Sequence, residues 1–233
     1  FGMTAGAIIV YIFANRFPQE KLNTILSRQA FYFSLSTILS FLFHVFVPFL
    51  HSTSAMGIFI TVFTYTEISV PFVFSGICIS LLLTRFPDSV NRLYAADLIG
   101  ASLGCILVVI VLNVSGGPTG VIITAFVSAL AALFFLNNAG AAEKIKKILV
   151  FYTIVIALFS IYNTLLVNEQ NPILRLFWIR GQWTEKPMYE KWNSFTRVSV
   201  DGDSTKPEVP FGWGLSDKYD RSRKIHQLML NID

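Results

Sequence analysis

Two carboxylates, Glu67 and Asp97, lie inside apolar stretches of the sequence where charge is otherwise rare. An acid in the hydrocarbon of a bilayer costs about 3 kcal/mol on insertion scales, so each side chain needs a polar partner or a wet cavity. Acids at this depth often mark ion or substrate pathways. We therefore interpret Glu67 and Asp97 as membrane-embedded candidates for handling a ligand or a proton, and as a natural pair.

Asp97 belongs to residues 92–104, with the sequence RLYAADLIGASLG. Ala96, Gly100 and Gly104 recur every four residues, so they share one helix face that a neighbouring helix can approach closely. Asp97 lies beside that face. A purely structural alternative remains, in which this is a buried packing face whose acid is bonded to a nearby arginine or hydroxyl.

Glu67 lies four residues before Pro71 in an apolar segment. Pro71 has no N–H to donate to the Glu67 carbonyl, so the sequence predicts a kink or a break in the helix there. A freed carbonyl and a carboxylate would then meet near mid-membrane, where irregular backbone must face protein or water. The alternative is a kinked helix whose acid bonds its own neighbouring hydroxyls.

The composition indicates a helical membrane protein. The chain of 233 residues is 54% hydrophobic and 14% charged, it contains 22 Phe, and its mean hydropathy is +0.60. A soluble domain of this length rarely has such a composition. The two cysteines lie in different apolar runs and predict neither a disulfide nor a metal site. No catalytic triad or zinc motif occurs, and basic residues of the tail alternate with acids, which argues against nucleic-acid binding.

We expect a mainly α fold, a multi-span helical bundle followed by a short extramembrane segment with β structure. About six apolar segments meet or approach the length of a span, about 20 residues. A tight turn between two of them is predicted at the sequence SGGP, residues 115–118. The six segments are residues 1–14, 30–50, 55–83, 89–113, 121–136 and 148–167.

Basic residues follow alternate segments. Eight of them fall in three loops or at their edges, and the two intervening loops contain no Lys or Arg. By the positive-inside rule the basic loops are cytoplasmic, and the tail then emerges on the opposite side if all six segments cross. The alternative is a third segment that enters and leaves by one face. The eight residues are Arg16, Lys21, Arg28, Arg85, Arg92, Lys144, Lys146 and Lys147.

The character of the chain changes after the last apolar segment, which divides it into a transmembrane domain (residues 1–168), an interfacial linker (169–183) and an extramembrane part (184–233). The linker mixes apolar, basic and Trp residues, as segments in the membrane interface do. Strands are predicted over residues 194–200 and 225–232 from alternating apolar positions. Because the chain begins in an apolar run and ends in a predicted strand, we expect it to be a piece of a longer protein.

Several stretches resemble membrane-bound spermidine synthase-like proteins, in which a multi-span region precedes a domain of the polyamine aminopropyltransferase type. In the membrane part these are PFVFSG (71–76), residues 81–85 and RLYAADLIGASLG (92–104). In the tail, EKWNSFTRV (190–198) and LMLNID (228–233) resemble the start of the soluble domain.

The resemblance implies a Rossmann-like transferase that uses an S-adenosylmethionine-type cofactor, with its glycine-rich loop and catalytic acid beyond residue 233. It assigns no catalytic, cofactor-binding or metal-binding residue within this chain. S-adenosyl cofactors are cytosolic, whereas the loop charges direct the tail to the other side. Either the third segment is re-entrant, or the domain has departed from the usual chemistry.

Three functions follow as hypotheses. The first is the membrane region and leading edge of a spermidine synthase-like transferase in a bacterial plasma membrane, not catalytic by itself. The second is a transporter- or channel-like module that uses Glu67 and Asp97. The third is a membrane anchor that forms homo-oligomers through the Gly100/Gly104 face. The lipid bilayer is the expected partner in all three.

Overall fold

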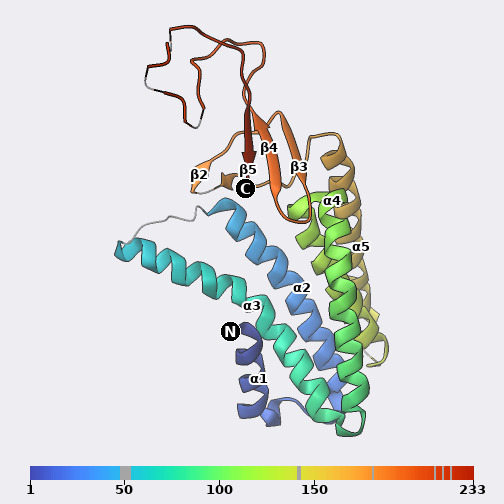
Figure 1. The fold of residues 1–233 in the computed structure, drawn as a ribbon. Coiled ribbons are helices and arrows are strands. Elements are labelled where there is room, and N and C mark those ends of the chain that lie inside the picture. The colour runs from blue at the N-terminus through green and yellow to red at the C-terminus, as the bar shows by residue number, and fades with distance from the viewer. Residues whose placement is uncertain (48–53, 141–142, 180, 213, 217, 221) are drawn as a thin grey trace.

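The computed structural model describes residues 1–47, 54–140, 143–179, 181–212, 214–216, 218–220 and 222–233. It is mainly helical, with a small antiparallel sheet at one end (Figure 1). The end of the predicted second segment and part of the loop after it, residues 48–53, lie outside the described residues.

Four of the described helices are long and apolar enough to cross a membrane, and a fifth, α1, is shorter. Short 3-10 turns, η1 (Ala14–Arg16), η2 (Gln19–Lys21) and η3 (Pro87–Ser89), join α1 to α2 and α3 to α4. The helices are α1 (Gly2–Ile12), α2 (Leu22–Phe46), α3 (Ala55–Arg85), α4 (Val90–Asn137) and α5 (Glu143–Asn168).

Helix α4 contains both the fourth and the fifth predicted segments, because its chain reverses at Gly116. This residue has non-helical torsions, φ 73° and ψ 168°, which glycine adopts without a steric penalty. Across the turn, a Cβ added to Gly120 would lie 3.2 Å from the Val111 side chain. The predicted turn at residues 115–118 is therefore confirmed. It divides α4 into a first arm, residues 90–115, and a second arm, residues 117–137.

Hydroxyl groups join α2 to the second arm of α4. Ser27 and Ser34 of α2 donate to carbonyls of the second arm over 2.7 and 2.6 Å, and Ser128 returns a bond of 2.8 Å to a carbonyl of α2. Hydroxyls between helices bond well where the facing residues are small, and each bond is worth up to about 1–2 kcal/mol in a bilayer. The facing alanines of the second arm have no exposed surface.

Glycines allow α1 to approach α3 very closely. A Cβ added to Gly6 would overlap the carbonyl oxygen of Val73, and one added to Gly76 would overlap the carbonyl oxygen of Met3. Gly2 and Gly6 are four residues apart and lie on the same face of α1. Among the described residues, close packing of helices at glycines is therefore found between α1 and α3.

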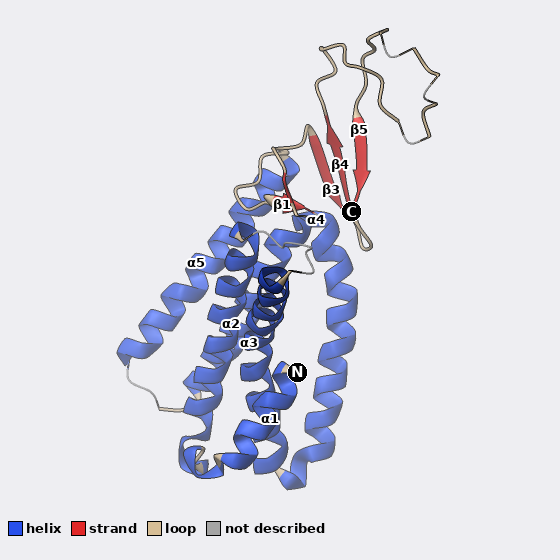
Figure 2. Cartoon of the chain, turned by 90° about the vertical axis from the view of Figure 1, so that its left-hand side faces the viewer, coloured by secondary structure: helices blue, strands red, loops and turns tan. Residues whose placement is uncertain are grey.

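The first arm of α4 stands apart from α1 and α3 (Figure 2). Nearly every residue from 91 to 110 is exposed within the chain. Its attachments to the bundle are at its two ends, the η3 turn and the reversal at Gly116. A long helix with no neighbour along its length has its side chains free for lipid or for another chain.

The linker contains a hairpin of β1 (Trp178–Ile179) and β2 (Gln182–Trp183), and the extramembrane part contains a separate sheet. The sheet is antiparallel in the order β3-β4-β5, with β3 (Tyr189–Trp192), β4 (Arg197–Asp201) and β5 (Met229–Ile232). The predicted strand at 194–200 is observed slightly later in the chain, as β4, and the one at 225–232 is observed as the shorter β5, whereas β1, β2 and β3 were not predicted.

The register of the sheet aligns its apolar side chains on one face. Val198 pairs with Ile232, and Val200 pairs with Leu230. The sequence predicted that the apolar residues of each strand share a face, but not how the strands pair. Leu230 and Ile232 are about 60% exposed, whereas Arg197 on the other face is almost fully buried. The face toward the helices is therefore polar, and the apolar face is open.

The basic loops gather at one end of the bundle, and the sheet lies at the other (Figure 1). At the basic end, the Arg85 guanidinium donates to the carbonyls of Ala14 and Phe17 over 3.3 and 2.8 Å. At the other end, Phe46, the last residue of α2, stacks on Phe177 of the linker. Helix α3 runs continuously from its start at Ala55, which follows α2, back to the basic end.

Candidate functional site

Glu67 lies in the middle of α3, at a point where its backbone carbonyl approaches Ser40 of α2. Both of its carboxylate oxygens are buried, and neither has a hydrogen-bond partner among the described residues. Nearby hydroxyls do not serve it, because Thr66 donates to the Val62 carbonyl over 2.8 Å and Ser69 to the Thr66 carbonyl over 2.7 Å. The alternative in which the acid bonds its own neighbouring hydroxyls is therefore not observed among the described residues.

Pro71 leaves the Glu67 carbonyl without its helical N–H, as the sequence predicts. The helix nevertheless continues through Pro71, and α3 bends along its course (Figure 1). Ser40 of α2 takes the place of the missing donor, with its Oγ 3.4 Å from the Glu67 carbonyl oxygen. This separation exceeds the 2.5–3.0 Å of ordinary O–H···O bonds, so the contact is loose.

Asp97 lies on the first arm of α4 and is exposed, as are Ala96, Gly100 and Gly104. No atom lies within 4 Å of a Cβ added to Gly100 or Gly104, so the small-residue face packs against nothing within this chain. The structure does not bring Asp97 into contact with Glu67, whose carboxylate oxygens are buried without a partner in the part of the chain that the structure describes. The two acids therefore occupy separate environments.

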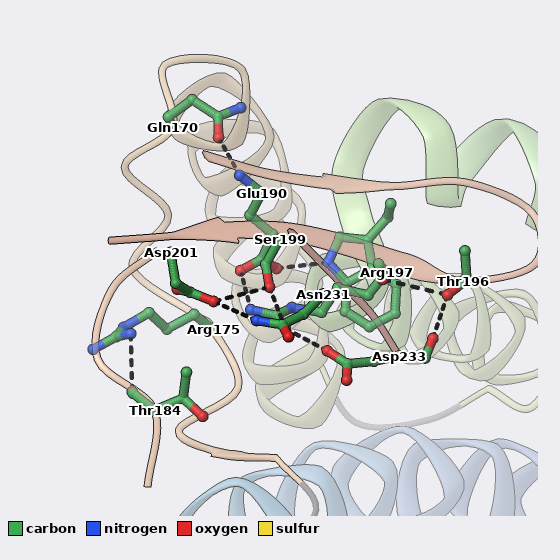
Figure 3. Close-up of polar contacts among 11 residues, drawn as sticks. Gln170, Arg175, Thr184, Glu190, Thr196, Arg197, Ser199, Asp201, Asn231 and Asp233 are labelled. Atoms are coloured by element: carbon green, nitrogen blue, oxygen red, sulfur yellow. Dashed lines mark hydrogen bonds and ion pairs between the residues drawn. The ribbon is translucent and has the colours of Figure 1, made fainter. Parts of the chain in front are cut away.

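A second polar cluster lies on the buried face of the sheet, around Arg197 (Figure 3). The side chain of Arg197 is 4% exposed, and its guanidinium pairs with Glu190 over 2.9 Å and with Asp233 over 2.8 Å. Glu190 also accepts a bond of 2.8 Å from the indole N–H of Trp192. Burial by itself lowers the pKa of Arg197, but the hydrogen bonds and charges of Glu190 and Asp233 outweigh burial, so its pKa is raised above the ordinary value.

This Arg197 cluster is built to hold the sheet together. Asn231 of β5 donates to Asp201 of β4 over 2.8 Å, and Ser199 lies 3.5 Å from the Arg197 guanidinium (Figure 3). A guanidinium that is paired with two carboxylates is neither a nucleophile nor a base. Among the described residues no group of three or more His, Cys, Asp or Glu could hold a metal ion.

The sheet rests directly on the reversal of α4. The indole of Trp192 lies against Gly116 and Gly117, and a Cβ added to Gly117 would lie 2.7 Å from its ring. Beside this contact is a cavity of about 30 Å³, lined by Thr119, Glu190 and Trp192 among others. A volume of this size accommodates one water molecule.

Asn163 connects α5, the second arm of α4 and the linker. It has no exposed surface, donates to Thr119 Oγ1 over 2.8 Å, and accepts from the backbone N–H groups of Ile173 and Leu174 over 2.9 and 3.2 Å.

Sequence reasoning missed Asn163 and the Arg197 cluster. Asn163 was detectable as the amide nearest the centre of the last apolar segment, whereas the Arg197 cluster depends on strand register. The close α1 contact also had a signal, the Gly2 and Gly6 spacing.

Together these features define a mainly helical protein with four helices that could cross a membrane and a small sheet docked at one end. No family model, curated protein or solved structure matches the chain.

Proposed function

We propose that this chain is a multi-pass membrane scaffold that carries an extramembrane domain of the spermidine synthase-like kind in a bacterial plasma membrane. The observation that carries the proposal is the docking of the sheet, through Trp192, on the helix ends opposite the basic loops. Trp192 and the glycines beneath it make this a specific contact rather than a flexible attachment. The resemblance of residues 92–104, 190–198 and 228–233 supplies the kind of domain.

On this proposal α2, α3, α5 and both arms of α4 cross the bilayer, and α1 packs beside α3. Basic residues at one end make that end cytoplasmic. The sheet then lies on the outer side, since α3 is continuous and returns to the basic end. The exposed apolar face of the sheet is the surface that the rest of the domain covers.

Labelling of single cysteines in sealed right-side-out vesicles tests this orientation. In a full-length protein with Cys78 and Cys105 changed to Ala, a membrane-impermeant maleimide should label Ser204→Cys at once. Lys146→Cys should react only after the vesicles are opened. Both positions are exposed in the structure. Labelling of both from the same side would overturn the orientation and favour a re-entrant third segment.

The chemistry is tested on the full-length protein with decarboxylated S-adenosylmethionine and putrescine as the substrates. Transfer of the aminopropyl group, measured by mass spectrometry of the amine product, supports a transferase of this class. The outer location proposed for the sheet separates the domain from cytosolic cofactor, so the assay supplies the cofactor directly. Absence of both transfer and cofactor binding would reduce the proposal to a scaffold whose domain has other chemistry.

A second candidate function is homo-oligomerisation, favoured by the unpacked first arm. Gly100 and Gly104 have open space around them, so Gly100→Leu leaves the fold of one chain intact and blocks a close helix contact between two chains. Cross-linking in membranes should then show loss of the dimer. Ser102→Leu, about 200° away around the helix, is the matched control. An unchanged dimer in Gly100→Leu would exclude this face.

A further inference from the structure

We propose that Glu67, the Glu67 carbonyl and Ser40 form a site between α2 and α3 for a single positive charge, either a proton or a dehydrated monovalent cation such as Na⁺. This site is independent of the extramembrane domain and of the transferase chemistry proposed for it. It also excludes Asp97, which the sequence suggested as the natural partner of Glu67.

A buried carboxylate needs hydrogen bonds or an opposite charge to compensate for its burial. Both oxygens of Glu67 are buried, and neither has a hydrogen-bond partner among the described residues. Burying an ionised carboxylate without compensation costs far more than burying a hydrogen-bonded neutral group. The basic side chains of the neighbouring loops gather at the end of the bundle, so no described Lys or Arg pairs with it. A small cation or a proton supplies the missing charge.

Two further oxygens, the Glu67 carbonyl and the Ser40 hydroxyl, meet at the backbone of the same residue. Pro71 cannot donate to the Glu67 carbonyl, which leaves a lone pair free. Ser40 Oγ lies 3.4 Å from this carbonyl oxygen, a loose contact from which the hydroxyl can turn to face a ligand. Ser36 and Thr37, one turn earlier in α2, instead donate to carbonyls of their own helix over 2.6 and 2.7 Å. Ser40 is thus the hydroxyl of this turn that reaches α3.

The donor atoms of the site indicate which class of ligand it binds. All three groups present oxygen atoms, which suit hard cations and not the metals that prefer sulfur or imidazole. The site has one formal negative charge, from Glu67, whereas Ca²⁺ sites in proteins use six to eight oxygens and commonly several carboxylates. Carbonyls released at irregular points of transmembrane helices coordinate Na⁺ or protons in transporters. One acid, one carbonyl and one hydroxyl therefore match a single positive charge.

Aromatic side chains flank the site. Aromatic pairs join α2 and α3 on both sides of Glu67 along the helices. Phe43 and Phe63 lie with ring centroids 5.3 Å apart toward the sheet end, and Phe33 and Phe72 lie 6.4 Å apart toward the basic end. Phe63 and Phe72 are 45% and 47% exposed within the chain, so these rings flank the site without sealing it. Electrostatic attraction is stronger where a bilayer excludes water.

The test uses the full-length protein in lipid nanodiscs. Infrared difference spectra should contain a neutral carboxyl band that Glu67→Gln removes and Asp97→Asn keeps. If the ligand is Na⁺, adding NaCl in place of N-methylglucamine chloride bleaches this band and releases heat in calorimetric titration. If the ligand is only a proton, the band responds to pH and not to Na⁺. No Glu67-dependent band at any pH at which the protein is folded, together with no Glu67-dependent Na⁺ heat, overturns the proposal.

Two further variants test the other oxygens without touching the carboxylate. Pro71→Ala restores the N–H that competes for the Glu67 carbonyl, and Ser40→Ala removes the hydroxyl. Each should weaken binding of the cation about two- to tenfold, the range expected for one hydrogen-bond-sized interaction. Ser36→Ala is the control, because its hydroxyl already serves its own helix. Equal binding in all three variants would contradict the assignment of Ser40 and the freed carbonyl.

Discussion

Arg197 is the residue whose removal should cost the extramembrane sheet most. Its guanidinium is buried between Glu190 and Asp233. Arg197→Met leaves two largely buried carboxylates without their cation, and breaking a buried pair in this way costs about 3–5 kcal/mol. The fluorescence of Trp192, which bonds to Glu190, should report unfolding of the sheet at a lower urea concentration.

The control for Arg197 is Lys191→Met, which removes an exposed cation from the opposite face of the same sheet. We expect it to change stability by under about 0.5 kcal/mol, as surface substitutions usually do. Equal urea midpoints for the two variants would show that the Arg197 cluster does not hold the sheet.

Asp203 should titrate in an unusually acidic range. The Thr205 hydroxyl and the Thr205 N–H donate to its carboxylate, and Lys206 lies 3.0 Å away, which together lower its pKa from 3.8 to about 2. Because the folded pKa is below the unfolded one, the stabilisation is present above pH 3.8 and is lost as the pH falls through about 2.

NMR titration of the Asp203 carboxyl carbon checks this value. Thr205→Val removes the hydroxyl donor, which is the largest cause of the shift, so the midpoint should move upward. The carboxyl of Asp220, whose pKa is lowered by Ser222 instead, is an internal control and should not move. If the titration midpoint of Asp203 is the same in Thr205→Val as in the unchanged protein, the assigned cause is wrong.

Local chemistry at Glu67 could be derived from the sequence, whereas long-range pairing could not. Pro71 frees the Glu67 carbonyl because the i to i−4 relation is fixed by helix geometry. The pairing of Arg197 with Asp233 joins residues 36 apart, and it depends on how β4 and β5 align. Alternation located β4 and β5 approximately, but it missed β1, β2 and β3 and did not reveal that the polar face would be the buried one.

At the scale of the helix, Gly6 and Gly100 form a matched pair for substitution. A Cβ on Gly6 would overlap the Val73 carbonyl oxygen, whereas one on Gly100 meets no atom within 4 Å. Gly6→Leu should therefore separate α1 from α3 at a cost of about 1–3 kcal/mol, the usual range for overpacking. Gly100→Leu should leave the thermal stability of one chain unchanged.

Thermal unfolding in detergent, with oligomeric state recorded in parallel, separates these two effects. A loss of stability in Gly100→Leu without a change in oligomeric state would mean that the first arm packs within one chain. A stable Gly6→Leu protein would show that α1 contributes little to the bundle.

Asn163 should behave as a structural residue between elements. Asn163→Leu removes a donor to Thr119 and an acceptor for two backbone N–H groups of the linker. A buried donor without a hydrogen-bond partner costs about 1–3 kcal/mol. We therefore expect amide hydrogen exchange to accelerate in the linker and at the C-terminal end of α5. Asn113→Leu is the control, because Asn113 is exposed and bonds only to its own helix. Equal exchange in both variants would remove the role assigned to Asn163.

Sequence periodicity located the helices but not their partners. The reversal at Gly116 was predicted, because Gly-Gly-Pro is a strong turn signal. The packing of α1 on α3, and the isolation of the first arm, depend on tertiary arrangement. Gly100 and Gly104 have the same four-residue spacing as Gly2 and Gly6, yet only the latter two are packed in this chain. Spacing indicates that a face can pack closely, not what it packs against.

For the whole molecule, the sequence predicted that basic residues lie at one end, but it did not predict where the sheet docks on the helices. Alternate loops carry all the basic residues of the membrane region, which predicts two unlike ends. The structure places the sheet at the end without them (Figure 1). Its contact through Trp192 requires Gly116 and Gly117 to lack side chains. The two segments are about 75 residues apart in the chain, so this requirement cannot be recognised until the fold brings them together.

This contact predicts that the helices and the sheet are coupled through one indole ring. A Cβ at position 117 would lie 2.7 Å from the Trp192 ring, so Gly117→Ala should lift the sheet off the reversal of α4 and accelerate amide exchange in β3, β4 and β5. Adding Trp192→Leu should remove the clash and restore part of the protection, which gives a negative coupling in the double-mutant cycle. Gly212→Ala, at a glycine with open surroundings, should leave exchange unchanged. If Gly117→Ala and Trp192→Leu instead act additively, the sheet is held by other contacts, and the helices do not set its position.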